Sequence, residues 1–136
     1  MNLDAVQQAI YTALVAAVSD DYDGIYTKVP QASDSGSTVP FPYLTITIPD
    51  ATRWDTKTDN GMSVDVDVHA WERDDSDLAI RQRLNGVYGA LHRTGTLSIA
   101  GVSVVTCLFN SSAFYDDPDG VTRHAVLTFR ITYQID

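Results

Sequence analysis

The last third of the chain alternates apolar and polar side chains over an unusually long stretch. From Val121 to Ile135 the odd-numbered residues are mostly apolar and the even-numbered residues mostly polar. A period of two is typical of a β-strand with one buried face. The segment Asp116–Gly120 contains the Pro, Asp and Gly residues that tight turns favour. We predict a long hairpin from Ser103 to Ile135, whose odd-numbered face covers a core and whose even-numbered face meets water or another subunit.

Two helices and several shorter strands are predicted before this hairpin. Apolar residues spaced by three and four indicate a helix over residues 2–18 and a second helix through Ile80, Leu84, Val87, Tyr88 and Leu91. His92 and Arg93 are expected near the end of the second helix, and Gly95 is expected to stop it. Asn2 or Asp4 is expected to cap the first helix, and the cluster 74–77 the second. The expected strands are 25–29, 42–49, 61–72 and 96–99, with the polar segment 50–60 as a projecting loop.

These elements predict one α+β domain that spans residues 1–136. A chain of this length is the size of a single domain. Helices that alternate with groups of strands joined by tight turns favour two helices packed on one face of a mostly antiparallel β-sheet. The long C-terminal β-hairpin forms part of that sheet.

The charge balance limits the partners of this domain. Nine basic and 18 acidic residues give a formal charge of 9 − 18 = −9, without a cluster of Lys and Arg. Such a domain is not expected to grip DNA, although an acidic surface suits DNA that slides past it. We expect a soluble intracellular product with no membrane partner, for three reasons. The chain has a single cysteine, Cys107, it has no apolar run long enough for a membrane span, and it has no basic leader.

The residues show no catalytic, cofactor or metal motif. His69, His92 and His124 have none of the spacings of zinc sites, and we expect ordinary strand or helix-end histidines. Asp65 and Asp67 lie on one strand face without a third ligand close in sequence, which favours a solvated acidic face. We therefore expect no enzyme, no cofactor and no metal.

The two tryptophans are the best candidates for protein contacts. Trp54 and Trp71 are predicted at exposed or loop positions, and aromatic and Arg side chains are common interface anchors. The alternative is that each indole folds back over the edge of its own sheet. The predicted interface comprises these tryptophans, their charged neighbours and the hairpin turn: Arg53, Trp54, Asp55, Lys57, Trp71, Arg73, Asp117 and Asp119.

Six short strings in this order resemble one known family, the tail-completion or tail-terminator proteins of siphophages and gene-transfer particles. The resemblance covers nearly the whole chain. The strings are DAVQQAIYTAL from Asp4, FPYL from Phe41, WDTKT from Trp54, VHAWER from Val68, VYGALH from Val87 and DPDGVTRH from Asp117.

The resemblance implies a structural virion protein, assembled in the host cytoplasm. Such proteins form a ring, usually of six subunits, that caps the tail tube, ends its polymerisation and docks to the head connector, or stopper, while DNA passes through the lumen. A closely related head-completion or connector subunit on the portal side is an alternative. An acidic small-ligand-binding domain or enzyme subunit is a second alternative. The resemblance assigns no catalytic residue.

A ring of acidic subunits is expected to repel the phosphates of DNA in its bore. Six copies would carry 6 × (−9) = −54 formal charges. The residues expected to face the lumen are Asp20, Asp21, Asp23, Asp65 and Asp67. The 50–60 loop and the hairpin turn are expected to contact a neighbouring subunit, the tail tube or the connector.

Overall fold

The predicted hairpin is the longest strand pair of the structure. A computed structural model describes residues 2–27, 40–73, 76–92, 97–116, 118 and 120–136. Asp116 lies opposite Arg123 at one end of the hairpin and Val102 opposite Ile135 at the other. The elements are α1 (Leu3–Val18), β1 (Gly24–Tyr26), β2 (Tyr43–Arg53), β3 (Gly61–Glu72), α3 (Asp77–Leu91), β4 (Val102–Asp116) and β5 (Arg123–Ile135).

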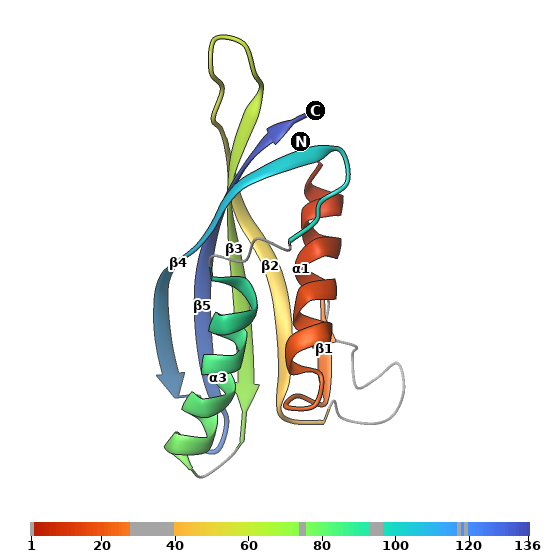
Figure 1. Cartoon of the computed structure of the whole chain (residues 1–136). Helices are drawn as coiled ribbons and strands as arrows, with labels where there is room; N and C mark the ends of the chain where they lie inside the picture. Colours follow the sequence, from red (N-terminus) through yellow and green to blue (C-terminus); the bar gives the residue numbers. More distant parts are fainter. Residues whose placement is uncertain (1, 28–39, 74–75, 93–96, 117, 119) are drawn as a thin grey trace, which may run out of the picture.

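The strands form one sheet in the order β1-β2-β3-β5-β4. The short β1 runs parallel to β2, and every other neighbouring pair is antiparallel. Both helices lie in front of the sheet in the view of Figure 1, and they contact each other. The α+β class with a mostly antiparallel sheet is therefore confirmed.

The core lies between the helices and one face of the sheet. The odd-numbered residues of β5 from Ala125 to Tyr133 are buried, as the alternation predicted, and so are the even-numbered residues of β3 from Val64 to Ala70. Each helix adds an apolar stripe to the same cluster. The helical members are Val6, Ala9, Ile10, Leu14 and Val18 from α1, with Ile80, Leu84, Val87 and Leu91 from α3.

The two helices begin differently. Ser76 caps α3 as predicted, because its Oγ accepts a hydrogen bond from the Ala79 N–H at 3.2 Å. Asn2 occupies the cap position of α1 with a left-handed backbone, but its side chain makes no cap bond. The Asn2 amide instead donates to the carbonyl of Ala100 at 3.2 Å, so it ties the helix to the chain before β4.

Three strand predictions need correction. β2 continues to Arg53, because a bulge between Thr47 and Asp50 shifts the register and the ladder then resumes. Pro49 therefore lies inside the strand and does not end it. Residues 97–99 form no strand, although Leu97 and Ile99 are buried, so their apolar character reflects core packing. β1 ends at Tyr26, Thr27 follows outside the strand, and residues 28 and 29 of the predicted 25–29 strand lie outside the described residues.

Candidate interaction surface

The β2–β3 hairpin projects beyond the rest of the fold (Figure 1). Its tip is held by hydrogen bonds of its own backbone and side chains. The Trp54 N–H donates to the Gly61 carbonyl at 2.8 Å, and the Gly61 N–H donates to Asp55 Oδ1 at 3.0 Å. A Cβ at residue 61 would lie 2.3 Å from the Trp54 carbonyl oxygen, so the close strand crossing requires glycine.

The side chains of this tip are available to a partner. Arg53 keeps 83% of its side chain exposed although its Nε lies 3.3 Å from Asp55 Oδ2. Trp54 is 41% exposed and Lys57 is also exposed. Four of the predicted interface residues, Arg53, Trp54, Asp55 and Lys57, are thus brought together at one projecting end.

Trp71 lies at the opposite end of β3 and is half-buried, and Arg73, directly after the strand, is exposed. The Trp71 ring stacks on His124 with centroids 3.9 Å apart, and its Nε1 donates to Thr45 Oγ1 at 3.4 Å. The Arg73 guanidinium lies 4.2 Å from the Phe41 ring centroid, and its Nε donates to Thr122 Oγ1. The Trp71 indole therefore lies over its own sheet, as the alternative prediction described. A contact between Trp71 and a partner protein stays a prediction.

Trp71 belongs to a line of rings that we call the aromatic row: Tyr26, Tyr43, Trp71, His124 and Tyr115. Successive centroids are 6.0, 6.2, 3.9 and 5.8 Å apart. The row crosses the sheet from β1 to β4, and it ends at Tyr115, which is 57% exposed. Alternation placed Trp71 and His124 on the outer face, but only the strand order aligns them. The sequence analysis therefore missed the row.

A histidine pair adjoins the aromatic row. His69 Nδ1 and His124 Nε2 are 2.8 Å apart, and Thr47 Oγ1 lies 3.1 Å from His69 Nε2. Burial lowers the pKa of His69 below its ordinary value of 6.5, against a smaller opposing effect of Asp67. His92 is remote from the pair and accepts the Phe109 N–H on Nδ1. Within the described ranges, no three His, Cys, Asp or Glu residues form a metal-binding group.

The acidic residues fall into two groups. Asp65 and Asp67 lie on the outer sheet face, where Asp65 accepts from Arg130 Nε at 3.0 Å and Asp67 accepts from Thr128 Oγ1 at 2.7 Å. Arg130 thus partly compensates the charge of Asp65. Asp20, Asp21 and Asp23 follow α1 and are exposed. Asp117 and Asp119 lie outside the described residues, so their predicted contacts cannot be placed.

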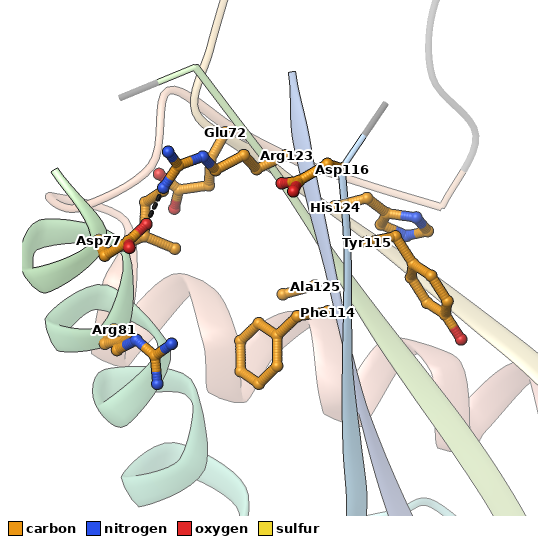
Figure 2. Close-up of a pocket in the computed structure, with 10 residues that line it drawn as sticks. Glu72, Asp77, Arg81, Phe114, Tyr115, Asp116, Arg123, His124 and Ala125 are labelled. Carbon is orange, nitrogen blue, oxygen red and sulfur yellow. Dashed lines mark hydrogen bonds and ion pairs between the residues drawn. The ribbon is translucent and has the colours of Figure 1, made fainter. Parts of the chain in front are cut away.

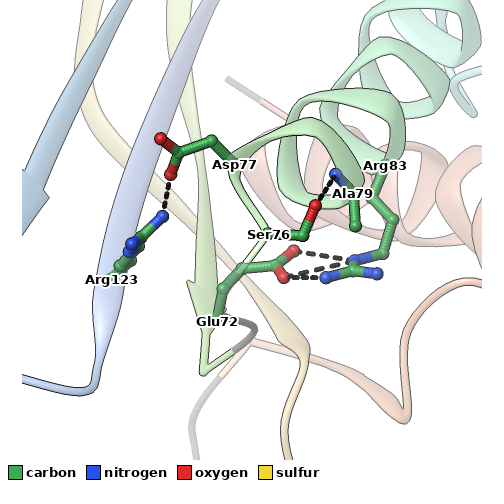
Figure 3. Close-up of polar contacts among 6 residues, drawn as sticks. All are labelled: Glu72, Ser76, Asp77, Ala79, Arg83 and Arg123. Carbon is green, nitrogen blue, oxygen red and sulfur yellow. Dashed lines mark hydrogen bonds and ion pairs between the residues drawn. The ribbon is translucent and has the colours of Figure 1, made fainter.

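A buried ion pair joins β3 to α3 (Figure 3). Glu72 is only 1% exposed, and both of its oxygens accept from the Arg83 guanidinium, with Nε at 3.1 and 3.2 Å. No role was predicted for Glu72. Its even number places it on the buried face of β3, and this alternation was the signal for its burial.

A cavity of about 260 Å³ opens between α3 and the adjacent ends of β4 and β5 (Figure 2). Asp77 and Arg123 form an ion pair at its rim, and the Arg81 guanidinium lies 5.4 Å from the Phe114 ring centroid. Glu72 contributes its paired carboxylate. The charged groups that the structure places here thus compensate one another, an arrangement that does not favour acid–base catalysis.

These features define a small α+β subunit with an open sheet face, a projecting hairpin and two exposed sheet edges. Neither helix, within the described part of the chain, is long and apolar enough to cross a membrane. The family model of tail completion protein gp17 matches residues 5–134. The chain therefore belongs to this family and is a structural protein of phage-type tails.

Solved structures have the same fold. A chain of the virion of a native gene transfer agent particle superposes with a TM-score of 0.79 at 19% identity, over 97% of this chain and 96% of that chain. The gp17 protein of bacteriophage SPP1 gives a TM-score of 0.55 at 20% identity, over 98% and 90% of the two chains. No curated protein sequence matches the chain.

Proposed function

We propose that this protein forms a ring, of six subunits, that caps the last ring of the tail tube. The ring ends polymerisation of the tube and joins the tail to the head connector, or stopper, while DNA passes through its lumen. The role is structural and involves no catalysis. The observation that carries this proposal is the family match over residues 5–134.

Two surface features support assembly with copies and with other tail proteins. One face of the sheet carries the aromatic row and has no helix over it in Figure 1. The hairpin tip with Arg53 and Trp54 extends away from the core, where it contributes little to its own fold and is available to the tail tube or the connector.

The charge of the chain fits a passage for DNA. An acidic bore repels phosphates and so prevents DNA from sticking during ejection. Asp20, Asp21 and Asp23 are better candidates for this surface than Asp65, because Arg130 compensates Asp65 within the same subunit. Asp67 also remains a candidate, because its hydrogen-bond partner, the Thr128 hydroxyl, carries no compensating charge.

The test is assembly with and without this protein. Native mass spectrometry over a range of protein concentrations, and electron microscopy of purified tail tubes mixed with the protein, are expected to show a ring at the tube end. Particles that lack the protein are expected to have tubes of irregular length that do not join heads. Tubes of normal length joined to heads in its absence would refute the proposal.

A head-completion subunit on the portal side is the second candidate, since it shares the ring habit and small size. Binding assays with purified tail tube and purified connector separate the two roles, because a tail cap binds the tube without the connector present. An enzyme or small-ligand binder is less favoured, since the cavity of Figure 2 holds compensated charges.

A further inference from the structure

The two outer strands of the sheet lie at the same level of the ladder. Gly24 on β1 pairs with Tyr43, which pairs in turn with Trp71, His124 and finally Tyr115 on β4. Two further rungs cross all five strands in the same way. One consists of Ile25, Leu44, Ala70, Ala125 and Phe114, and the other consists of Tyr26, Thr45, His69, Val126 and Ala113. The free edge of β1 is therefore level with residues 113–115 of β4.

Strand direction also suits a contact between these edges. β1 is parallel to β2, and the remaining three pairings are antiparallel, so β4 runs opposite to β1. A second copy rotated about an axis along the strands brings its β1 beside β4 of the first copy. The two strands are then antiparallel and at the same level, which is the orientation for a regular ladder.

The three rungs contain no charged side chain on either edge strand that would repel a second copy. Residues 102–115 of β4 contain no charged side chain, nor does β1, in a chain of net charge −9. Edge strands are usually protected by charges, prolines or bulges. β4 has two register shifts, at Val104/Thr106 and Phe109/Ser111, but none within Ala113–Tyr115. A second copy therefore meets no charge within the three rungs, and the first like charges to face each other are Asp23 and Asp116 on the next rung.

The exposed rings at these edges complete the argument. Phe114 and Tyr115 are 54% and 57% exposed at the end of β4. Tyr26 forms the other end of the aromatic row. A neighbouring copy placed at this level sets its Gly24 opposite Tyr115 and its Tyr26 opposite Ala113. Because the Tyr26 ring lies over Gly24 of its own strand, it meets the Tyr115 ring, and the aromatic row continues from one subunit into the next. Burial of such rings is a common source of interface stability.

We propose that β4 of one copy pairs with β1 of the next copy through Ala113–Tyr115 and Gly24–Tyr26, with Tyr26 opposite Ala113 and its ring against the ring of Tyr115. The inference rests on the ring of the proposed function and specifies its contact. The interface is head-to-tail, so it repeats around a closed ring and does not stop at a dimer.

Disulfide trapping tests this contact directly. In a Cys107→Ala background, Tyr26→Cys with Ala113→Cys, the two positions that the ladder sets opposite each other, is expected to give, on mild oxidation, a ladder of linked chains up to the ring size on a non-reducing gel. Each single cysteine variant is expected to remain unlinked. Dimers from Ala113→Cys alone would indicate a two-fold β4–β4 contact and overturn the proposal, as would an unlinked double variant.

Alanine variants give a second readout. Tyr115→Ala and Tyr26→Ala are each expected to raise the concentration at which rings form by at least about tenfold. The control Leu108→Ala removes an exposed apolar side chain of β4 that lies outside the three rungs. It is expected to change the concentration at which rings form by less than about threefold. Circular dichroism and urea unfolding confirm that each variant folds.

These outcomes separate the contact from the function. If the wild-type protein forms rings on tail tubes and these variants behave like it, the contact is wrong and the proposed function stands. If the wild-type protein forms no ring either alone or on tail tubes, the proposed function fails and this contact fails with it.

Discussion

Glu72 and Arg83 form a buried ion pair that fixes the start of α3 against the end of β3. Glu72 lies eleven residues before Arg83, and its carboxylate is 1% exposed. A buried carboxylate without a cation is costly, because it loses hydration and gains no compensating charge. The pair therefore matters for the fold.

Loss of Arg83 is expected to destabilise the protein strongly. Arg83→Met leaves the Glu72 charge buried and unpaired, so the free energy of unfolding is expected to fall by about 3 kcal/mol. Urea unfolding at pH 7 measures this. The matched control is Arg130→Met, which removes the exposed partner of Asp65 and is expected to cost less than about 1 kcal/mol. Equal costs for the two variants would contradict the structural assignment.

Stability is expected to fall as the pH drops below about 6.5, with His69 as one cause. Burial lowers the pKa of folded His69 below 6.5, so between its folded and unfolded pKa values the unfolded chain binds more protons. Protonation therefore favours unfolding. Asp67 on β3, His124 on β5 and Thr47 on β2 surround the ring. Urea midpoints at pH 7.5 and 5.5 measure the loss.

The variant His69→Gln isolates this contribution from the rest of the chain. It cannot take up the proton, so its urea midpoint is expected to fall less between the two pH values than that of the wild-type protein. An identical pH dependence in both proteins would assign the acid sensitivity to other groups.

Cys107 is expected to be unreactive in the folded protein. It is 2% exposed, and burial raises the pKa of its thiol to about 11, so thiolate is scarce at pH 8. An aromatic disulfide reagent is expected to modify the folded protein at least roughly 100-fold more slowly than the urea-unfolded chain. Rapid modification of the native protein would show that this part of β4 opens readily.

The projecting hairpin tip is expected to act in assembly and not in stability. Replacement of residues 55–60 by Asn-Gly shortens the hairpin but keeps the core, so the free energy of unfolding is expected to change by less than about 1 kcal/mol. Tail joining or ring formation is expected to be lost. Trp54→Ala is the milder variant. If the shortened protein gives normal particles, the prediction that the tip, with Arg53, Asp55 and Lys57, contacts a partner is wrong.

The turn from Asp116 to Gly120, with Asp117 and Asp119, is a separate test of the same kind. Its replacement by a short Gly-containing turn is expected to leave the urea midpoint nearly unchanged and to abolish ring formation or tail joining. Wild-type assembly of this variant would refute the predicted contact.

Neutralising the exposed acidic cluster is expected to increase sticking of DNA. Asp20, Asp21 and Asp23 changed together to Asn alter the net charge of each subunit from −9 to −9 + 3 = −6. Assembled rings of this variant are expected to bind double-stranded DNA more tightly at low salt than the wild-type rings, with the difference lost at high salt. The control Asp65→Asn is expected to have a smaller effect, because Arg130 already compensates Asp65.

The sequence by itself determined the elements that carry a strong local period. The existence of β3, the long hairpin and the two helices follows from alternation or helical spacing over many residues, so each could be predicted without its neighbours. The end of α3 was placed too late, because the helix ends at Leu91 and the predicted stop was Gly95. The exposed hairpin tip with Trp54 was predicted on the same grounds. Predictions failed where a short apolar segment had no such period, as at Leu97 and Ile99, which are buried outside any strand.

Only the tertiary structure decided which strands are neighbours and which residues share a rung. The aromatic row joins Tyr26 to Tyr115 through three strands between them, and the His69–His124 contact spans 55 positions of sequence. Register couples residues that are far apart in the chain, and a local pattern cannot encode it. Burial of Glu72 likewise depends on α3, which supplies Arg83 after the chain has turned back over the sheet.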